Sequence, residues 1–287
     1  MKWYVLLPLF VVSYSALVGP FTAYMHNKPF VEKLGYVPQA EALRLTAADQ
    51  RVFIADALVL KALFYYGSLI EKSSTKIPLP PDYFSIYKTI ETSVKLDPYN
   101  LDAYYFVQAV ITWDAKRVQE ANTLLEYGMK YREWDYLLPF FLGFNYAYFL
   151  KDYPNAARCY KRAADLSGIP LYANLAGRYM YESGRTDLAL AYLSAMEKGA
   201  RNASIKKTFQ VRIAAFKEVK RIETAVAAYK NTFGLPPRSL GDLLRNGFLK
   251  EPPVDPYGGQ FFIDENGQVK STSKFAYAGA KPEEQQR

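Results

Sequence analysis

Three alanines recur at a nearly constant spacing along the middle of the chain. Ala121, Ala156 and Ala189 are 35 and 33 positions apart (156 − 121 and 189 − 156), and each lies in an aromatic-rich stretch with helical periodicity. Such a period is typical of repeat proteins, in which one helix pair cannot bury its apolar face alone and must stack on the next pair. We therefore expect stacked helix pairs whose first helices line a concave surface suited to holding another polypeptide.

The fourth expected pair carries the clearest motif. Gly177 lies where two helices approach closely, Gly184 lies in the turn between them, and Ala189 lets the helix backbones touch. The third pair follows the same pattern with one extra residue in its first half, through Gly143, Tyr146, Asp152, Tyr153, Ala156, Tyr160 and Ala163. The second pair keeps Ala121 but has no such glycines. These motifs resemble the tetratricopeptide repeat family, which implies a mainly α fold built as an α-solenoid that binds proteins.

The expected helices follow from apolar periodicity and from breakers. A long helix begins near Thr46, whose hydroxyl caps it, and a proline-rich stretch of Pro78, Pro80 and Pro81 separates it from the next helix. The apolar positions of the long helix follow helical spacing at Phe53, Ala57, Leu60, Leu63, Phe64 and Gly67. The remaining helices are expected at 82–96, 104–113, 117–129, 137–150, 155–166, 171–183 and 186–198.

The amino terminus resembles a membrane span. No charged residue occurs from Trp3 to Met25, and a bilayer requires about 20 apolar residues. A cleavable signal would need small residues before the cut, and Ser13 with Ser15 fits this poorly, so a retained transmembrane helix is favoured. Because a short positive head usually stays inside, we expect a bacterial inner-membrane protein whose body faces the periplasm.

Net charge and cysteine content exclude few classes of partner. The formal net charge of +8 permits nucleic acid, anionic lipid or acidic protein partners and selects none of them. The single cysteine, Cys159, excludes a disulfide within the chain. It lies on a repeat helix beside Tyr160, which predicts a small buried core residue.

A long basic helix follows the repeats. Between Ile205 and Phe233 the helix has one apolar stripe and, opposite it, a basic face. We interpret the basic face as exposed to solvent. The alternative is that it docks to an acidic partner or to lipid phosphates. Aromatic residues do not interleave with the basic ones, so no nucleic-acid partner is predicted. The basic residues are Lys206, Lys207, Arg212, Lys217, Lys220 and Arg221.

The carboxy-terminal segment has a characteristic order of predicted elements. A helix end at Tyr229 leads to a leucine-rich turn, to an Asp255–Gly258 corner, and to a hairpin that turns at Asn266 and Gly267. From Val226 to Thr272 this order resembles the end of the major pseudopilin of type II secretion. That resemblance implies a small α+β hairpin module and a link to pilus or secretion machinery. The repeats separate this segment from the membrane helix and the chain start has no prepilin motif, so pilin-like polymerisation is not expected.

In that family the final loop can bind calcium. Asp255, Asp264 and Glu265 could supply oxygen ligands here, but capping and turn roles are the favoured interpretation, and no metal site is predicted. The expected organisation is an anchor or signal at 1–26, a linker at 27–45, tetratricopeptide-like repeats at 46–202, the long helix and pseudopilin-like module at 203–275, and a disordered tail at 276–287.

No catalytic constellation is found in the sequence. His26 is the only histidine and lies beside the apolar segment, and no glycine-rich phosphate loop occurs. We predict neither an enzyme nor a cofactor.

The repeat spacing instead predicts a partner-binding groove. Asn174 and Arg178 lie on adjacent turns and can clamp a peptide backbone or a terminal carboxylate. For Trp113 and Tyr181, packing against a neighbouring helix is an equal alternative. Counted back from Ala121 and Ala189, the groove residues are Phe106, Val110, Trp113, Asn174, Arg178 and Tyr181.

Together these features predict a membrane-anchored, exported scaffold. It would bind protein partners in the assembly of a cell-envelope machine such as a pilus or a secretion system. The alternative is a ligand-binding module whose groove aromatics stack on envelope glycan.

Overall fold

The computed structural model describes residues 3–27, 33–74 and 81–275. The fold is mainly helical, with one small antiparallel hairpin near the carboxy terminus. The chain forms two compact bodies, an N-terminal body of residues 1–97 and a C-terminal body of residues 98–287. The division falls at Asp97 and Pro98, inside the region predicted to hold the repeats. The predicted tail at 276–287, most of the proline-rich stretch and the start of the predicted linker lie outside the described residues.

The N-terminal body contains the apolar segment as helix α1 (Trp3–Asn27), which continues through Pro8 and Pro20. From Pro8 to Met25 it has no buried residue, and by length and composition it could cross a membrane. A second helical stretch, within Ala40–Ile70, passes the same test. A signal sequence would also pass it, so composition alone does not assign the role of α1.

The other helices of this body begin differently from the prediction. Helix α2 (Ala40–Ala47) lies partly within the expected linker, and one turn, η1 (Ala48–Gln50), leads into α3 (Arg51–Ser74). Thr46 therefore ends α2 instead of capping α3, and its hydroxyl bonds back to the carbonyl of Ala42 at 3.1 Å. Helix α4 (Tyr83–Leu96) begins as predicted, because the Asp82 side chain accepts the Ser85 N–H at 3.1 Å.

Helix α3 turns its predicted apolar stripe toward solvent. Its buried face packs on α4 through Ala55, Ala62 and Leu69, and the hydroxyl of Ser93 on α4 donates to the Ala55 carbonyl at 2.8 Å. On the opposite face Phe53 and Phe64 are each 69% exposed. Because α3 is apolar on nearly all sides, periodicity alone could not predict which face packs on α4. The face with the small alanines packs there, because alanines allow the two helices to approach closely.

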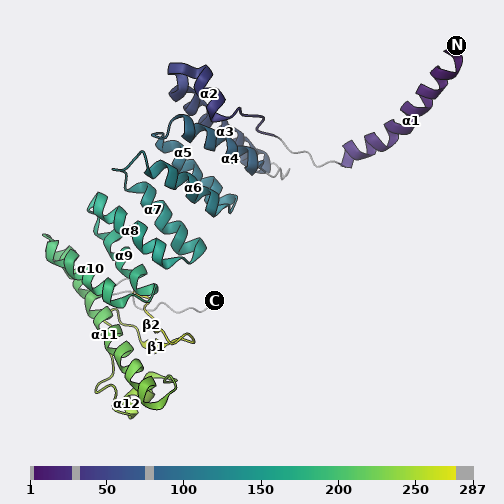
Figure 1. Ribbon diagram of the computed structural model, residues 1–287. Coiled ribbons are helices and arrows are strands. Elements are labelled where there is room, and N and C mark those ends of the chain that lie inside the picture. Colours follow the sequence, from purple (N-terminus) through teal and green to yellow (C-terminus); the bar gives the residue numbers. More distant parts are fainter. Residues whose placement is uncertain (1–2, 28–32, 75–80, 276–287) are drawn as a thin grey trace. The chain divides into compact units, whose positions relative to one another are not determined.

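In the C-terminal body, consecutive helices pack side by side (Figure 1). In the first two helix pairs of this body, the first helix ends in a wider π-helical segment. The elements are α5 (Leu101–Phe106) with η2 (Val107–Asp114), α6 (Val118–Met129), α7 (Leu137–Phe144) with η3 (Asn145–Leu150), α8 (Tyr153–Ser167), α9 (Pro170–Glu182), α10 (Thr186–Gly199) and α11 (Ala203–Phe233).

The three alanines that set the sequence period are fully buried. Five positions before each alanine, the chain turns through a left-handed backbone conformation, at Lys116 (φ 58°), Lys151 (φ 55°) and Gly184 (φ 75°). Glycine adopts this conformation without steric cost, whereas a lysine is strained there. The three turns therefore occupy equivalent places in three successive helix pairs.

In two of these pairs the first helix contains one residue more than the first helix of the α9–α10 pair, and the π-helical segment accommodates that residue. At the turn, the N–H of Arg117 bonds to the carbonyl of Ile111 and that of Asp152 to Tyr146, six residues back in each case. In the α9–α10 pair the equivalent N–H of Arg185 reaches Met180, five residues back. The extra residue predicted for the third pair is present in η3, and a second one, which was not predicted, lies in η2.

The C-terminal module continues from α11. It contains α12 (Leu240–Arg245) and the strands β1 (Phe261–Ile263) and β2 (Val269–Ser271), which pair antiparallel with Phe261 opposite Ser271. The Asp264 carboxylate accepts the backbone N–H groups of the hairpin turn, and that of Asp255 accepts the Tyr257 N–H at 2.9 Å. Both aspartates thus have the turn-stabilising role expected of them.

Candidate partner-binding pocket

Three of the six predicted groove residues are buried. Phe106 and Val110 are in the core because the π-helical segment shifts the helix face by one residue relative to a count back from Ala121. Tyr181 packs beneath the C-terminal module, where its ring stacks on Phe216 at 4.9 Å and its hydroxyl donates to the Val269 carbonyl. These three side chains therefore cannot form an accessible groove.

The other three predicted residues reach the surface. Trp113 is 39% exposed, and Asn174 and Arg178 are partly exposed. On α5 and η2 the accessible line consists of Tyr105, Ala109 and Trp113. The sequence prediction missed Tyr105 because nothing in the second pair marks the extra residue in η2.

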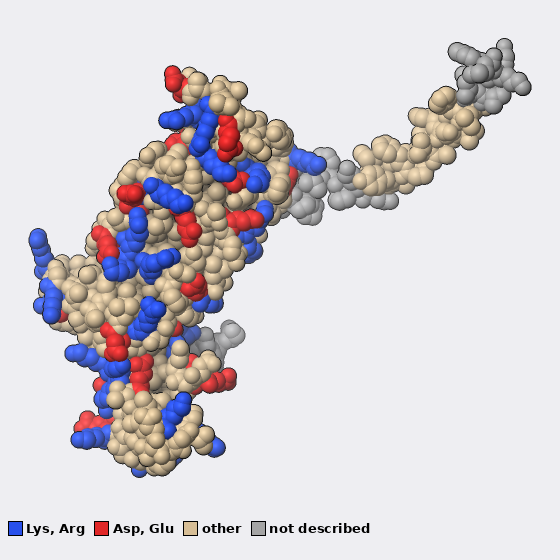
Figure 2. All heavy atoms as spheres, in the orientation of Figure 1, with Lys and Arg blue, Asp and Glu red and all other residues tan. Residues whose placement is uncertain are grey.

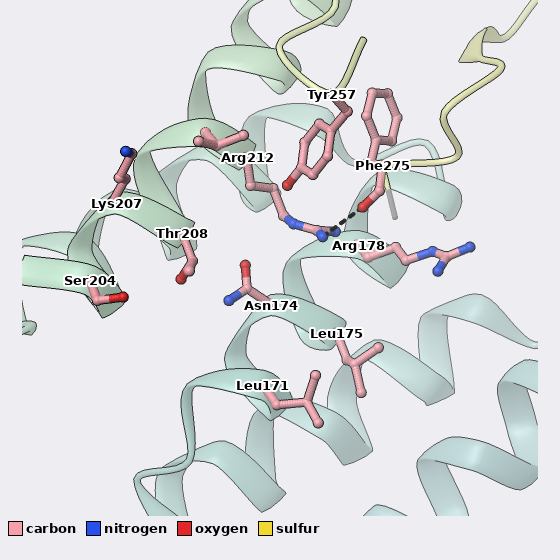
Figure 3. Close-up of a pocket in the computed structure, with 11 residues that line it drawn as sticks. Leu171, Asn174, Leu175, Arg178, Ser204, Lys207, Thr208, Arg212, Tyr257 and Phe275 are labelled. Atoms are coloured by element: carbon pink, nitrogen blue, oxygen red, sulfur yellow. Dashed lines mark hydrogen bonds between the residues drawn. The ribbon is translucent and has the colours of Figure 1, made fainter. Parts of the chain in front are cut away.

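Asn174 and Arg178 line a pocket of about 540 Å³ inside the C-terminal body (Figure 3). One side is formed by α9, the other by α11, and the end of the C-terminal module completes it. The lining residues are Leu171, Asn174, Leu175 and Arg178 from α9, Ser204, Lys207, Thr208, Val211 and Arg212 from α11, and Tyr257 and Phe275 from the module.

The lining of this pocket is positive, since among the described residues it holds Arg178, Lys207 and Arg212 and no acidic residue. In the part of the chain that the structure describes, none of these three forms an ion pair. Elsewhere, positive and negative side chains are interspersed on the face seen in Figure 2. Other basic residues of α11 have partners: Lys206 pairs with Glu197 at 3.6 Å, Lys220 with Asp187 at 2.7 Å and Arg221 with Glu218 at 2.7 Å.

Of the three cations, Arg212 has the largest number of buried nitrogens without a hydrogen-bond partner. Its Nη2 donates to the Phe275 carbonyl at 2.8 Å, and its guanidinium carbon lies 5.6 Å from the centre of the Tyr257 ring. Nε and Nη1 are shielded from water and have no hydrogen-bond partner among the described residues. Burial lowers the pKa of Arg212 and the positive charge of Arg178 acts in the same direction, whereas the interaction with Tyr257 opposes both. Since an arginine remains charged at neutral pH, the pocket wall carries a cation without a counterion.

Asn174 presents a hydrogen-bond acceptor to the same space. Its Nδ2 donates to the Pro170 carbonyl at 3.1 Å. A carbonyl can only accept, so this bond fixes which end of the amide is the nitrogen and leaves Oδ1 as an acceptor. In Figure 3, Asn174 and Arg212 point into the space between α9 and α11, whereas Arg178 points away from it. Asn174 and Arg212, on two different helices, therefore face the same space, and Arg178, which was predicted to act with Asn174, does not.

A separate aromatic cluster lies on the first two helix pairs of the C-terminal body. The ring of Trp113 lies 5.0 Å from that of Phe149 and 5.6 Å from that of Tyr148. Two lysines with left-handed backbones lie over these rings, Lys116 at 5.8 Å from Trp113 and Lys151 at 5.3 Å from Tyr148. This arrangement offers a partly exposed aromatic surface, made of rings inclined to one another and bordered by positive charge.

No family model matches the chain, and no curated protein is significantly similar to it. The pocket and the aromatic cluster are therefore the features from which we infer a function.

Proposed function

We propose that the protein is a membrane-anchored scaffold that binds a protein partner through the first helices of a tetratricopeptide-like solenoid. The side-by-side packing of consecutive helices and the three buried alanines support the repeat interpretation. The apolar, unburied α1 supports an anchor, and by the usual charge rule the body would face the periplasm of a bacterium.

The observation that carries this proposal is the pocket that Asn174 and Arg178 line. Two residues predicted to contact a partner lie at a cavity whose lining, within residues 81–275, holds three cations and no acid. Cavities of a few hundred Å³ with a few polar groups among apolar ones are the usual form of binding sites. In this proposal the partner belongs to an envelope assembly such as a pilus or a secretion system, as the pseudopilin-like order of the module suggests.

Photo-crosslinking in intact cells tests the proposal. A photoreactive phenylalanine at Tyr105 or Leu171, both exposed, is expected to capture one defined partner. The same group at Thr123, which is exposed on α6, serves as the matched control and is expected to capture none. Equal capture at all three positions, or capture at none, contradicts a partner held by the first helices.

The aromatic cluster favours a second candidate function, the binding of envelope glycan. Sugar rings stack on exposed aromatic faces, and Trp113 with Tyr148 offers such a surface. The two lysines adopt strained backbones at turns where α9 and α10 use glycine, and such strain often occurs at functional positions. Retention of the chain on purified envelope glycan, lost on Trp113→Ala, would favour this function. Retention unchanged by that substitution would remove the cluster from consideration.

A further inference from the structure

We propose that the exposed face of α3 lies on the lipid surface of the membrane that α1 anchors, so that the N-terminal body contacts the bilayer at two places. This inference rests on the proposed anchor, because α1 would hold α3 near the lipid. Three observations support it: the composition of the face, the packing of the opposite side of α3 on α4, and the short chain between α1 and α2.

The exposed face of α3 is apolar over most of the helix. From the first to the last of its exposed apolar side chains, α3 extends over about 28 Å at 1.5 Å per residue. A continuous apolar surface on a soluble body usually marks a contact with a partner or a membrane. The side chains that form this face are Val52, Phe53, Leu60, Leu63, Phe64 and Ile70.

The composition of the face favours lipid over a protein partner. Among the described residues from Val52 to Ile70, no exposed position holds Trp, Tyr or Arg, the residues that most often anchor protein interfaces. Asp56 and Lys61 are the exposed residues of this range whose side chains can form hydrogen bonds, whereas an ordinary protein interface contains about ten hydrogen bonds. Phenylalanine and leucine are typical of the apolar face of helices that lie in a lipid interface.

Asp56 and Lys61 also indicate that α3 lies on the bilayer instead of spanning it. A charged side chain near the centre of a span is costly, whereas at the surface the long Lys61 side chain can reach the headgroups. Helix α3 also remains packed on α4, where the Ser93 hydroxyl donates to the Ala55 carbonyl at 2.8 Å. Because Ala55 and Phe64 lie on opposite sides of α3, α4 would face away from the lipid.

The chain keeps α3 close to the anchor. Residues 28–39 join the end of α1 to the start of α2, and a chain of this length reaches at most about 40 Å. Such a tether raises the local concentration of the attached surface, so a weak affinity for lipid is enough to hold the face there. The contact would fix which side of the N-terminal body faces the bilayer.

Quenching of a fluorescent label by lipid tests the proposal on the full chain in vesicles. In a Cys159→Ala background, the label NBD is attached at Leu60→Cys on the face, at Lys88→Cys on α4 or at Ser15→Cys in α1. The vesicles contain phosphatidylcholine and phosphatidylglycerol, with or without a lipid that carries a nitroxide on its acyl chain. We expect this lipid to quench most of the fluorescence at positions 60 and 15 and little of it at position 88, because quenching requires contact with acyl chains.

Two results would overturn the proposal. If iodide in the water quenches the label at position 60 as strongly as the label at position 88, and the nitroxide lipid quenches neither, the face of α3 lies in water. If the label at position 60 is shielded from both quenchers, protein covers the face. A second copy of the chain would be that cover if dilution to one chain per vesicle abolishes the shielding.

Substitutions that place a charge on the face should lift it from the lipid. Phe64→Asp adds a carboxylate that lipid contact would dehydrate, so it should remove most of the lipid quenching of a label at Leu60→Cys. Phe84→Asp adds the same charge at an exposed aromatic position of α4 and should leave the quenching unchanged. Both positions are exposed, and circular dichroism checks that each variant folds. Full quenching in the Phe64→Asp variant would contradict the proposal.

The label in α1 separates this inference from the proposed anchor. Lipid quenching at Ser15→Cys without quenching at Leu60→Cys would retain the anchor and remove the contact of α3 with lipid. Quenching at Leu60→Cys alone would have the opposite meaning.

Discussion

Gly177 of α9 lies directly against Leu193 of α10. A β-carbon built on Gly177 would come within 2.8 Å of three atoms of the Leu193 side chain, which is fully buried. The two helices therefore pack at a distance that only glycine allows. Helices α7 and α8 also pack closely, since a β-carbon built on Gly143 would lie 3.1 Å from the Tyr160 ring.

Gly177→Ala is expected to destabilise the protein by about 1–3 kcal/mol, because the added methyl group overpacks a fully buried contact. The matched control is Gly199→Ala on α10, where nothing lies within 4 Å. That substitution should be neutral or stabilise the helix slightly. Urea denaturation of both variants measures the difference, and equal midpoints would contradict the close contact.

Asn145→Ala is expected to cost about 2–4 kcal/mol, because it leaves two buried amides without partners. The Asn145 amide exchanges hydrogen bonds with Gln108 at 2.9 and 3.0 Å, and donates to Asn122 at 2.8 Å, so it joins three helices. Gln119→Ala, at an exposed position of α6, controls for the loss of an amide. If the two variants unfold at the same urea concentration, the buried network contributes nothing measurable.

Glu223 is expected to make stability fall as pH rises. Its carboxylate accepts a hydrogen bond from Thr186 at 2.8 Å, and burial raises its pKa above the ordinary value of 4.5. The folded protein then holds this proton more tightly than the unfolded chain, so the contribution is complete below pH 4.5 and is lost as pH rises through the folded-state pKa. Glu223→Gln should flatten this part of the stability profile, whereas Glu133→Gln, at an exposed position, should not. An unchanged slope in Glu223→Gln would show that the carboxylate is not desolvated.

Cys159 is expected to resist alkylation in the folded protein. It is buried, as the sequence predicted, and burial raises the pKa of its thiol from 9.0 to about 11. Between pH 9 and 10 a free thiol is largely ionised and reacts with iodoacetamide, whereas Cys159 stays protonated. Mass spectrometry should find slow labelling of the folded chain and fast labelling in urea; similar rates in both would place Cys159 at the surface.

Phe64→Ala and Leu69→Ala on α3 should differ strongly in their effect on the free energy of unfolding. Phe64 is exposed, so its truncation should change the free energy of unfolding by no more than about 0.5 kcal/mol, whereas buried Leu69 should cost about 2–5 kcal/mol. Thermal or urea unfolding in detergent measures both. A large cost at Phe64 would mean that the apolar face of α3 is covered in solution.

The sequence predicted the helical framework well because its signals are local. Asp82 caps α4, and the helices around the three periodic alanines lie near their expected positions. The burial of Phe106 and Val110 could not be predicted, because one extra residue in η2 rotates the helix without leaving a mark in the sequence. Tyr181 is buried by the C-terminal module, which is distant in sequence. Arg212 was predicted to lie on a solvated basic face. Its place at the pocket depends on contacts with Tyr257 and Phe275, which are distant in sequence and set only by tertiary packing.

The bare phenylalanines of α3 have a practical consequence. Removing residues 1–32 is the obvious way to make the rest of the chain manageable in water, yet that truncation leaves Phe53, Leu60 and Phe64 facing the solvent. The truncated protein would still expose an apolar surface on α3, so it should aggregate or bind detergent. Its solubility would therefore depend on α3 as much as on the absence of α1.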